Sequence, residues 1–168
     1  MQNLSADFRD AFRAHPAGVA LITASVAGIP YGLTISSLAS LSIEPVAVSF
    51  SLTKESGAAG AVLSASSFMI HMLGEEHSEL ADNFARPGAP RFTPDQGWSY
   101  LPTGEPHFHK APVSMRAQIH SSISVGGSRL IAAEILEVIT GEPVQHLMYQ
   151  NRGYLKLPSL LDASVPCK

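Results

Sequence analysis

Cysteine is nearly absent from this chain of 168 residues, whose single cysteine, Cys167, is the penultimate residue. An intrachain disulfide is therefore impossible, which favours a protein of a reducing compartment, the cytoplasm. The segment Met1–His15 alternates charged and apolar residues. It lacks the uninterrupted apolar core of a signal peptide, which agrees with the same compartment.

Charge and long apolar runs are also scarce. Charged residues make up 15% of the chain and the formal net charge is -3, so we expect no nucleic-acid partner, which would need a basic face. No apolar run approaches the roughly 20 residues of a transmembrane helix, and no membrane association is expected. A chain of this length fits one domain, and its weakly charged surface is compatible with an oligomer.

The common catalytic signatures are missing too. The sequence contains no G-x-S-x-G nucleophile elbow, no H-E-x-x-H or cysteine pair for a metal, no G-x-G-x-x-G and no P-loop. The pair His107 and His109 is interpreted as part of a surface loop, and no metal is expected. An enzyme of this kind would need a bound cofactor, for which the protein supplies a pocket, orientation and hydrogen bonds.

A dense cluster of hydroxyl side chains is present between two strand-like apolar runs, Gly18–Ala24 and Val46–Leu52. The cluster consists of Thr34, Ser36, Ser37, Ser40 and Ser42. Small hydroxyl residues let backbone amides approach a ligand and add donors of their own, which suits a phosphate or the edge of a flavin. The alternative is that these residues simply fill a turn between strands.

A second polar segment, Thr53–Gly57, follows the other end of the strand Val46–Leu52 and precedes a helix predicted over Ala58–Ser64. The free amides and dipole of a helix N-terminus, with Ser, Thr and Lys beside them, form a natural anion site. An ordinary N-cap is the alternative. Because both polar segments flank one strand, they could converge at one end of a barrel.

The remaining pattern predicts a mainly β fold with a few short helices. The other helices are expected at Ser5–Ala14, with Ser5 as N-cap, and at Ser78–Phe84. The other strands are expected at Gly18–Ser25, Tyr31–Ser36, Phe68–Leu73, Val113–Val125, Leu130–Thr140 and Tyr154–Leu157. The segment Val144–Tyr149 is a helix or a strand, Ala85–Pro112 is irregular, Gly126–Arg129 is a turn and 158–168 is a tail. Closure into a barrel would remove the sheet edges.

In order and spacing, these segments resemble the flavin reductase-like family, short-chain reductases with an FMN-binding split barrel. The resemblance runs from about Phe8 to Leu157 of a single domain, 1–168. Its motifs are F-R-x-A-F-x-x-x-P-x-G-V at Phe8–Val19, G-I-P-Y-G-L-T-I-S-S-L at Gly28–Leu38, L-S-I-E-P at Leu41–Pro45, F-M-I-H-M-L at Phe68–Leu73, L-A-D-N-F-A at Leu80–Ala85, R-F at Arg91–Phe92 and N-R-G-Y-L-K-L at Asn151–Leu157.

The resemblance implies an antiparallel Greek-key split β-barrel and hydride transfer from NADH or NADPH to FMN, FAD or riboflavin. It further implies a homodimer and the supply of reduced flavin to a partner monooxygenase. No catalytic side chain is expected, because the cofactor carries the chemistry. The alternative is a split-barrel protein that binds flavin or haem without reducing it.

Carried over by position, the resemblance also implies a set of flavin-binding residues. They are Thr34, Ile35, Ser36 and Ser37 along the flavin, Ser49, Phe50 and Ser51 at its pyrimidine edge, Lys54, Ser56 and Gly57 at its phosphate, and Phe84, Ala85 and Arg91 closing the pocket. Ser128, Arg129 and Tyr154 would border the nicotinamide side.

The chain departs from the family pattern at two places. Gly126-Gly127-Ser128 stands where members commonly have Gly-Asp-His, a histidine associated with the nicotinamide substrate, and His71 stands where an Asn is common. Arg129 could compensate by binding a phosphate of the dinucleotide, because a guanidinium binds phosphate through two parallel hydrogen bonds. Alternatively, Arg129 is a solvated hairpin residue.

Overall fold

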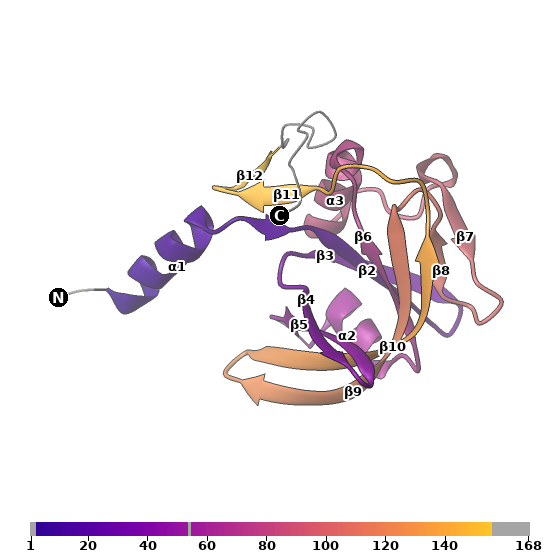
Figure 1. The fold of residues 1–168 in the computed structure, drawn as a ribbon, viewed down its shortest axis with the longest axis horizontal. Coiled ribbons are helices and arrows are strands. Elements are labelled where there is room, and N and C mark those ends of the chain that lie inside the picture. The colour runs from indigo at the N-terminus through magenta and orange to yellow at the C-terminus, as the bar shows by residue number, and fades with distance from the viewer. Residues whose placement is uncertain (1–2, 54, 156–168) are drawn as a thin grey trace, which may run out of the picture.

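An antiparallel sheet of seven strands dominates the computed structural model, which describes residues 3–53 and 55–155 (Figure 1). The strands follow the order β3-β2-β6-β9-β10-β5-β4. Their bounds are β2 (Ala20–Val26), β3 (Ile29–Ile35), β4 (Ala39–Ile43), β5 (Val46–Leu52), β6 (Phe68–Met72), β9 (Val113–Val125) and β10 (Ser128–Thr140).

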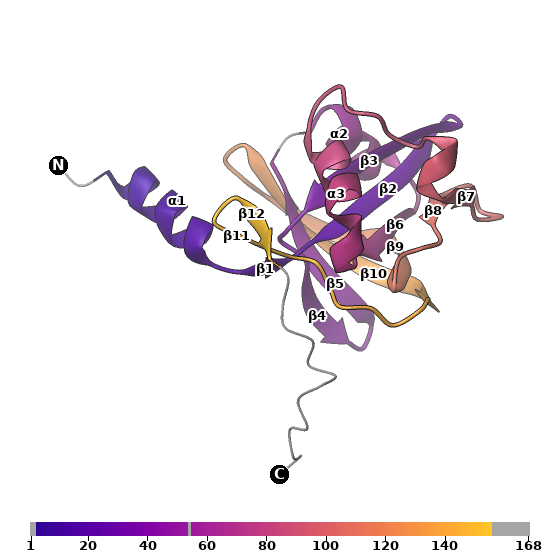
Figure 2. The same ribbon diagram turned by 90° about the horizontal axis from the view of Figure 1, so that it is seen from above.

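Two small sheets and three α-helices complete the described fold. The small sheets are β1 (Ala17–Gly18) with β11 (Met148–Gln150) and β12 (Gly153–Leu155), and β7 (Trp98–Tyr100) with β8 (Pro106–Phe108). The helices are α1 (Leu4–Ala14), α2 (Gly57–Ser64) and α3 (Ser78–Ala85), and the 3-10 turns are η1 (Glu75–His77) and η2 (Pro94–Gln96). Helix α1 projects from the body of the protein in both ribbon views (Figures 1 and 2).

Strand β2 separates two hydrophobic clusters, because its successive side chains point to opposite faces. Ala20, Ile22 and Ala24 belong to a cluster that α2 covers with Ala59 and Val62. Leu21 belongs to the other cluster, which α3 covers with Leu80, Ala81 and Phe84. Both faces of β2 are therefore buried, which explains why its sequence is almost continuously apolar.

The predicted mainly β fold is confirmed, but the sheet does not close. Within the described residues, backbone pairing stops at β3 on one edge and at β4 on the other. In the connection from β3 to β4 the Ser37 hydroxyl accepts a hydrogen bond from the Ser51 amide of β5 (3.0 Å) and donates to the Ser51 carbonyl (3.4 Å). This side chain extends the contact between β4 and β5 beyond their last backbone pair, Ala39 and Ser49, and leaves the gap between β3 and β4 open.

Several element boundaries differ from the sequence prediction. The cap of α1 is Asn3, whose side chain accepts from the Ala6 amide (3.3 Å), and not Ser5. Strand β4 was not predicted, because its serines indicated a turn. The segment predicted to be irregular contains η2, β7 and β8. Arg129 lies in β10, since the turn is confined to Gly126 and Gly127.

Strand β5 (Val46–Leu52) has the predicted bounds, and Val144–Tyr149 contributes to β11. Lys54 and the predicted tail 158–168, including Cys167, lie outside the described residues. Among the residues described, no helix has the length and apolar character needed to cross a bilayer.

Candidate functional site

Strand β3 and the residues that follow it, 36–38, border three hollows, which together contain most of the predicted site residues. The serine–arginine hollow, about 820 Å³, is lined by Ser36, Ser37, Ser51, Tyr149 and three arginines, among others. The tyrosine hollow, about 230 Å³, is lined by Val19, Thr34, Ile35, Ser36, Asp82, Ala85, Tyr149 and Tyr154. The helix-start hollow, about 350 Å³, includes Gly32, Leu33, Thr53, Ser56, Phe84 and Arg91.

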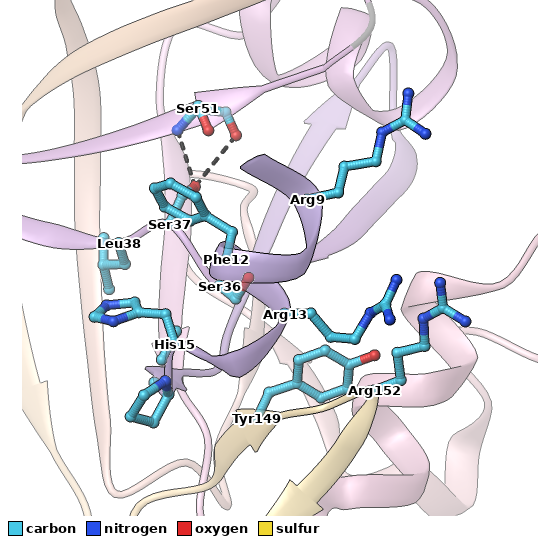
Figure 3. A pocket seen from close by; sticks show the side chains of 13 residues that line it. Arg9, Phe12, Arg13, His15, Ser36, Ser37, Leu38, Ser51, Tyr149 and Arg152 are labelled. Carbon is cyan, nitrogen blue, oxygen red and sulfur yellow. Dashed lines mark hydrogen bonds between the residues drawn. The ribbon is translucent and has the colours of Figure 1, made fainter. Parts of the chain in front are cut away.

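The serine–arginine hollow and the tyrosine hollow are neighbours, because Ser36 and Tyr149 line both. Figure 3 shows the first of them, with the hydrogen bonds between Ser37 and Ser51. Because the Ser37 hydroxyl both accepts from the Ser51 amide and donates to the Ser51 carbonyl, this residue positions the backbone of the site. Ser36 is exposed and its hydroxyl has no partner among the described residues, so it is available to a ligand.

The tyrosine hollow contains hydroxyls that are held by α3. Thr34 donates from Oγ1 to the Ala81 carbonyl (2.7 Å), and the Tyr154 hydroxyl donates to Asp82 Oδ1 (3.0 Å). Burial and the carboxylate of Asp82 raise the pKa of Tyr154 far above its ordinary value, so its phenol stays protonated. These contacts fix β12 and β3 to the same helix and make one wall of the hollow rigid.

The helix-start hollow lies at the N-terminus of α2. Ser56 is the N-cap of this helix and makes no side-chain capping bond, and Gly57 follows with φ +61°. The first amides of α2 and the Ser56 hydroxyl therefore remain available to an anion. Arg91 closes the opposite side of this hollow, where its guanidinium donates to the carbonyls of Asn83, Arg86 and Gly32.

Gly32 is needed because the Phe84 ring lies directly on β3. A Cβ at position 32 would lie 2.6 and 2.7 Å from Phe84 Cε1 and Cδ1. The ring has no room to move, since it is buried and packs against Phe92 (5.0 Å between centroids) and Trp98 (5.6 Å). The glycine thus lets α3 approach the strand that carries the site.

We expect Gly32→Ala to lower the free energy of unfolding by about 2 kcal/mol, the usual cost of overpacking a buried contact. Urea unfolding followed by circular dichroism measures this change. Gly127→Ala is the matched control: a Cβ there meets nothing within 4 Å, so its effect should stay within about 0.5 kcal/mol. Equal stabilities of the two variants would contradict the assigned role of Gly32.

Comparison with known proteins decides the family. Residues 12–158 match the flavin reductase like domain. This chain belongs to the flavin reductase-like family. It is 39% identical over 154 residues to an NADH:FMN oxidoreductase of Rhodococcus qingshengii, with 89% of this chain and 80% of the relative covered.

Two further relatives agree. The chain is 33% identical over 149 residues to the reductase component of a 4-nitrophenol 4-monooxygenase/4-nitrocatechol 2-monooxygenase from Rhodococcus opacus, covering 88% of this chain and 78% of that protein. The crystal structure of a flavin reductase domain protein from Arthrobacter sp. FB24 superposes with a TM-score of 0.85 at 33% identity, covering 92% and 96% of the two chains.

Some residues expected at the flavin reductase-like site have other roles in this structure. The Phe50 side chain is buried in the core against Phe68, with ring centroids 5.9 Å apart. Ile35 is also largely buried in that cluster, although it borders the tyrosine hollow. Ser49 lies within β5, paired with Ala39 and Ala132, and like Phe50 it can serve a ligand best through its backbone.

The expected nicotinamide-side residues are not brought together. Arg129 donates to Glu55 Oε1 from Nε (2.9 Å) and Nη2 (2.7 Å), which fastens β10 to the loop before α2. Tyr154 contacts Asp82 instead, and Ser128 begins β10 at the hairpin end. Arg129 is therefore neither free nor merely solvated, and it lies beside the loop predicted to bind phosphate.

Sequence reasoning missed the arginines of the serine–arginine hollow: Arg9, Arg13 and Arg152. Arg9 and Arg152 each lie within a family motif, but neither motif indicates which direction its side chains face. In the described part of the chain, His107 and His109 belong to no group of three or more His, Cys, Asp or Glu that could hold a metal ion, and His107 stacks on His71 (5.8 Å).

Proposed function

We propose that this protein is an NAD(P)H-dependent flavin reductase that supplies reduced flavin to a partner monooxygenase. The observation that carries the proposal is that three hollows, lined by hydroxyls, aromatic rings and an open helix start, adjoin β3 and the residues 36–38 that follow it. A flavin needs such a combination, because it has a polar ring edge, a hydroxylated chain and a phosphate. The relatives named NADH:FMN oxidoreductase and monooxygenase reductase component support the same reaction.

The donor set fits FMN. The Ser36 hydroxyl and the neighbouring β3 amides are placed to bind polar atoms of the ring and the ribityl chain, and Ser56 with the first amides of α2 is placed to bind the phosphate. Lys54, outside the described residues, is retained as a phosphate ligand from its position in the sequence. FAD can use the same contacts through its FMN half.

A bound flavin would supply the atom that accepts a hydride from the nicotinamide. The protein residues position and enclose the reactants, which is where catalysis by this fold would arise. Thr34 and Tyr154, both tied to α3, hold their wall of the tyrosine hollow in place. The tyrosine keeps its proton at neutral pH, so it contributes a fixed hydrogen bond rather than acid–base chemistry.

We also propose a cytoplasmic homodimer built from this single domain. Large apolar side chains are exposed on α1 and on strands β4, β9 and β10. They include Phe8, Phe12, Leu41, Ile43, Ile123, Val125 and Val138. Exposed large apolar side chains in such number favour protein–protein contacts. In such an assembly the family's split barrel would have its open edge covered by the partner.

The test is NADH or NADPH oxidation by the purified full chain, followed at 340 nm. We expect turnover when FMN is added and only the buffer rate without it. Lys54→Ala and Ser56→Ala should raise the KM for FMN about tenfold, because each removes a hydrogen bond to a charged phosphate. The KM for riboflavin, which lacks the phosphate, should stay within twofold.

The control for loss of charge is Lys110→Ala, which removes an exposed lysine outside the three hollows. It should leave both KM values unchanged. Absence of flavin-dependent NAD(P)H oxidation in the wild type would reject the reductase. The alternative is a flavin-binding protein without reductase activity, which the residues Gly127 and Ser128 suggest because they replace the family's Asp and His. It is supported if the protein binds flavin and anaerobic NADH does not bleach the yellow colour of the bound flavin.

A further inference from the structure

Three of the seven arginines in the chain line the serine–arginine hollow, and they differ from the other four in having few internal partners. Arg86, Arg116 and Arg129 form ion pairs with Asp82, Glu105 and Glu55. Arg91 donates to three backbone carbonyls.

By contrast, Arg9 and Arg152 have no side-chain partner among the described residues. Arg13 has one acidic partner, Asp10, on its own helix (2.9 Å). In Figure 3 the three arginines project on one side of the hollow, and Leu38 and His15 lie on the other. Among the residues that the structure describes, no acidic one lines this hollow, although the whole chain carries a net charge of -3.

The fold fixes the arginines relative to one another. Arg9 and Arg13 are four residues apart on α1, so they share one face of the helix. The end of α1 is joined to the turn between β11 and β12, because the Asn151 amide donates to the Arg13 carbonyl (2.8 Å) and Gln150 Nε2 donates to the Ala14 carbonyl (2.7 Å). Arg152 is thereby held beside Arg13.

The backbone of Arg152 adds a second observation. Both central residues of the β11–β12 turn, Asn151 (φ 51°) and Arg152 (φ 64°), have positive φ. Asn-Gly is the favoured pair in such turns, because glycine adopts positive φ without cost. Here an arginine occupies the usual glycine position in spite of that strain, and it lines the hollow. Backbone strain of this kind concentrates at functional sites.

We propose that Arg9, Arg13 and Arg152 bind the diphosphate of the nicotinamide dinucleotide. Guanidinium groups bind phosphate oxygens through paired hydrogen bonds, and two unpaired arginines with a third beside them match the two negative charges of a diphosphate. The serine–arginine hollow continues into the tyrosine hollow through Ser36 and Tyr149, so one extended ligand can occupy both. This inference rests on the proposed function and adds residues to it.

The experiment compares wild type with the double variant Arg9→Gln/Arg152→Gln. Dissociation constants for NAD⁺, FAD and FMN are measured by calorimetry, and the KM for NADH is measured with FMN as the flavin. We expect the variant to weaken NAD⁺ binding by about tenfold to a hundredfold and to leave the dissociation constants of FMN and FAD within twofold. The salt dependence of the affected constant should become shallower, because fewer charges pair with the ligand. Lys110→Gln is the control for lost positive charge.

Each outcome has a defined meaning. Weaker NAD⁺ binding and a higher KM for NADH, with FMN and FAD unchanged, support the assignment of the arginines to the nicotinamide dinucleotide. The proposal is overturned if the NAD⁺ dissociation constant and the KM for NADH stay within twofold, or if FMN or FAD binding weakens as much as NAD⁺ binding. The calorimetric constants do not require turnover, so failure of the reductase assignment is seen separately, as absent NADH oxidation in the wild type.

Discussion

Replacing Arg116 by methionine is expected to lower the free energy of unfolding by about 3 kcal/mol, the largest single effect that this structure predicts. Arg116 on β9 donates from Nε to Glu105 Oε1 (2.7 Å). Glu105 is 2% exposed, and its carboxylate also accepts hydrogen bonds from the hydroxyls of Ser67 and Thr103. The network fastens the loop between β7 and β8 to the main sheet.

The cost is large because the variant leaves a buried carboxylate without its counter-charge. Burial alone would raise the pKa of Glu105, but the hydrogen bonds from Ser67, Thr103 and Arg116 outweigh it and lower the pKa to about 2. Since the folded-state pKa lies below the unfolded value of 4.5, this stabilisation is complete above pH 4.5 and is lost as the pH falls toward 2.

Urea unfolding at pH 7 measures the effect, and the double variant Glu105→Gln/Arg116→Met tests its origin. The double variant should lose clearly less free energy of unfolding than Glu105→Gln and Arg116→Met lose in sum, because it leaves no unpaired charge buried. Arg86→Gln is the matched control: it breaks the exposed Arg86–Asp82 pair and should cost no more than about 0.5 kcal/mol. If Arg116→Met lowers the free energy of unfolding by less than about 1 kcal/mol, Arg116 is not the essential partner of the buried Glu105 carboxylate.

The second large effect is a pH dependence that originates at His71. This imidazole is completely buried on β6, and its two nitrogens contact Thr23 Oγ1 (3.1 Å) and Ser114 Oγ (2.9 Å). The Thr23 hydroxyl donates to the Pro106 carbonyl (2.6 Å), so Nε2–H must donate to Thr23. Nδ1 then accepts from Ser114, which makes both contacts consistent with a neutral ring.

Burial, with the nearby His107 adding to it, lowers the pKa of His71 from 6.5 to about 3. Above pH 6.5 the imidazole is neutral in both folded and unfolded states and adds no pH dependence. Between pH 6.5 and 3 the unfolded chain binds a proton that the folded chain does not. His71 should therefore reduce the stability by about 1.4 kcal/mol for each pH unit in this window.

Unfolding free energies measured from pH 6.5 to 5, above the range in which carboxylates titrate, test this expectation. His71→Asn, which keeps a hydrogen-bonding side chain, should make the slope shallower. The same series with His120→Asn, at an exposed position of β9, controls for the loss of an imidazole in general. If the unfolding free energy of His71→Asn changes with pH as steeply as that of the wild type, the pH dependence does not originate at His71.

The sequence by itself determined the local elements and the family. The apolar run Val46–Leu52 has the bounds of β5, and helices were expected close to α1, α2 and α3. These features could be predicted because periodicity, caps and turns depend on residues within a few positions of one another. The ordered motifs identified the flavin reductase-like family for the same reason, since each is a local pattern.

The tertiary structure alone decided which distant residues meet. Arg9 and Arg152 share a hollow, Ser37 binds the backbone of Ser51, and Glu105 finds Arg116. The Ser37 contact extends the pairing of β4 with β5, and the sheet stays open between β3 and β4. Such contacts depend on the direction of side chains across the whole packed chain, and no local pattern contains that information. The strands could therefore be predicted from the sequence, whereas the convergence of charge on the proposed dinucleotide site could not.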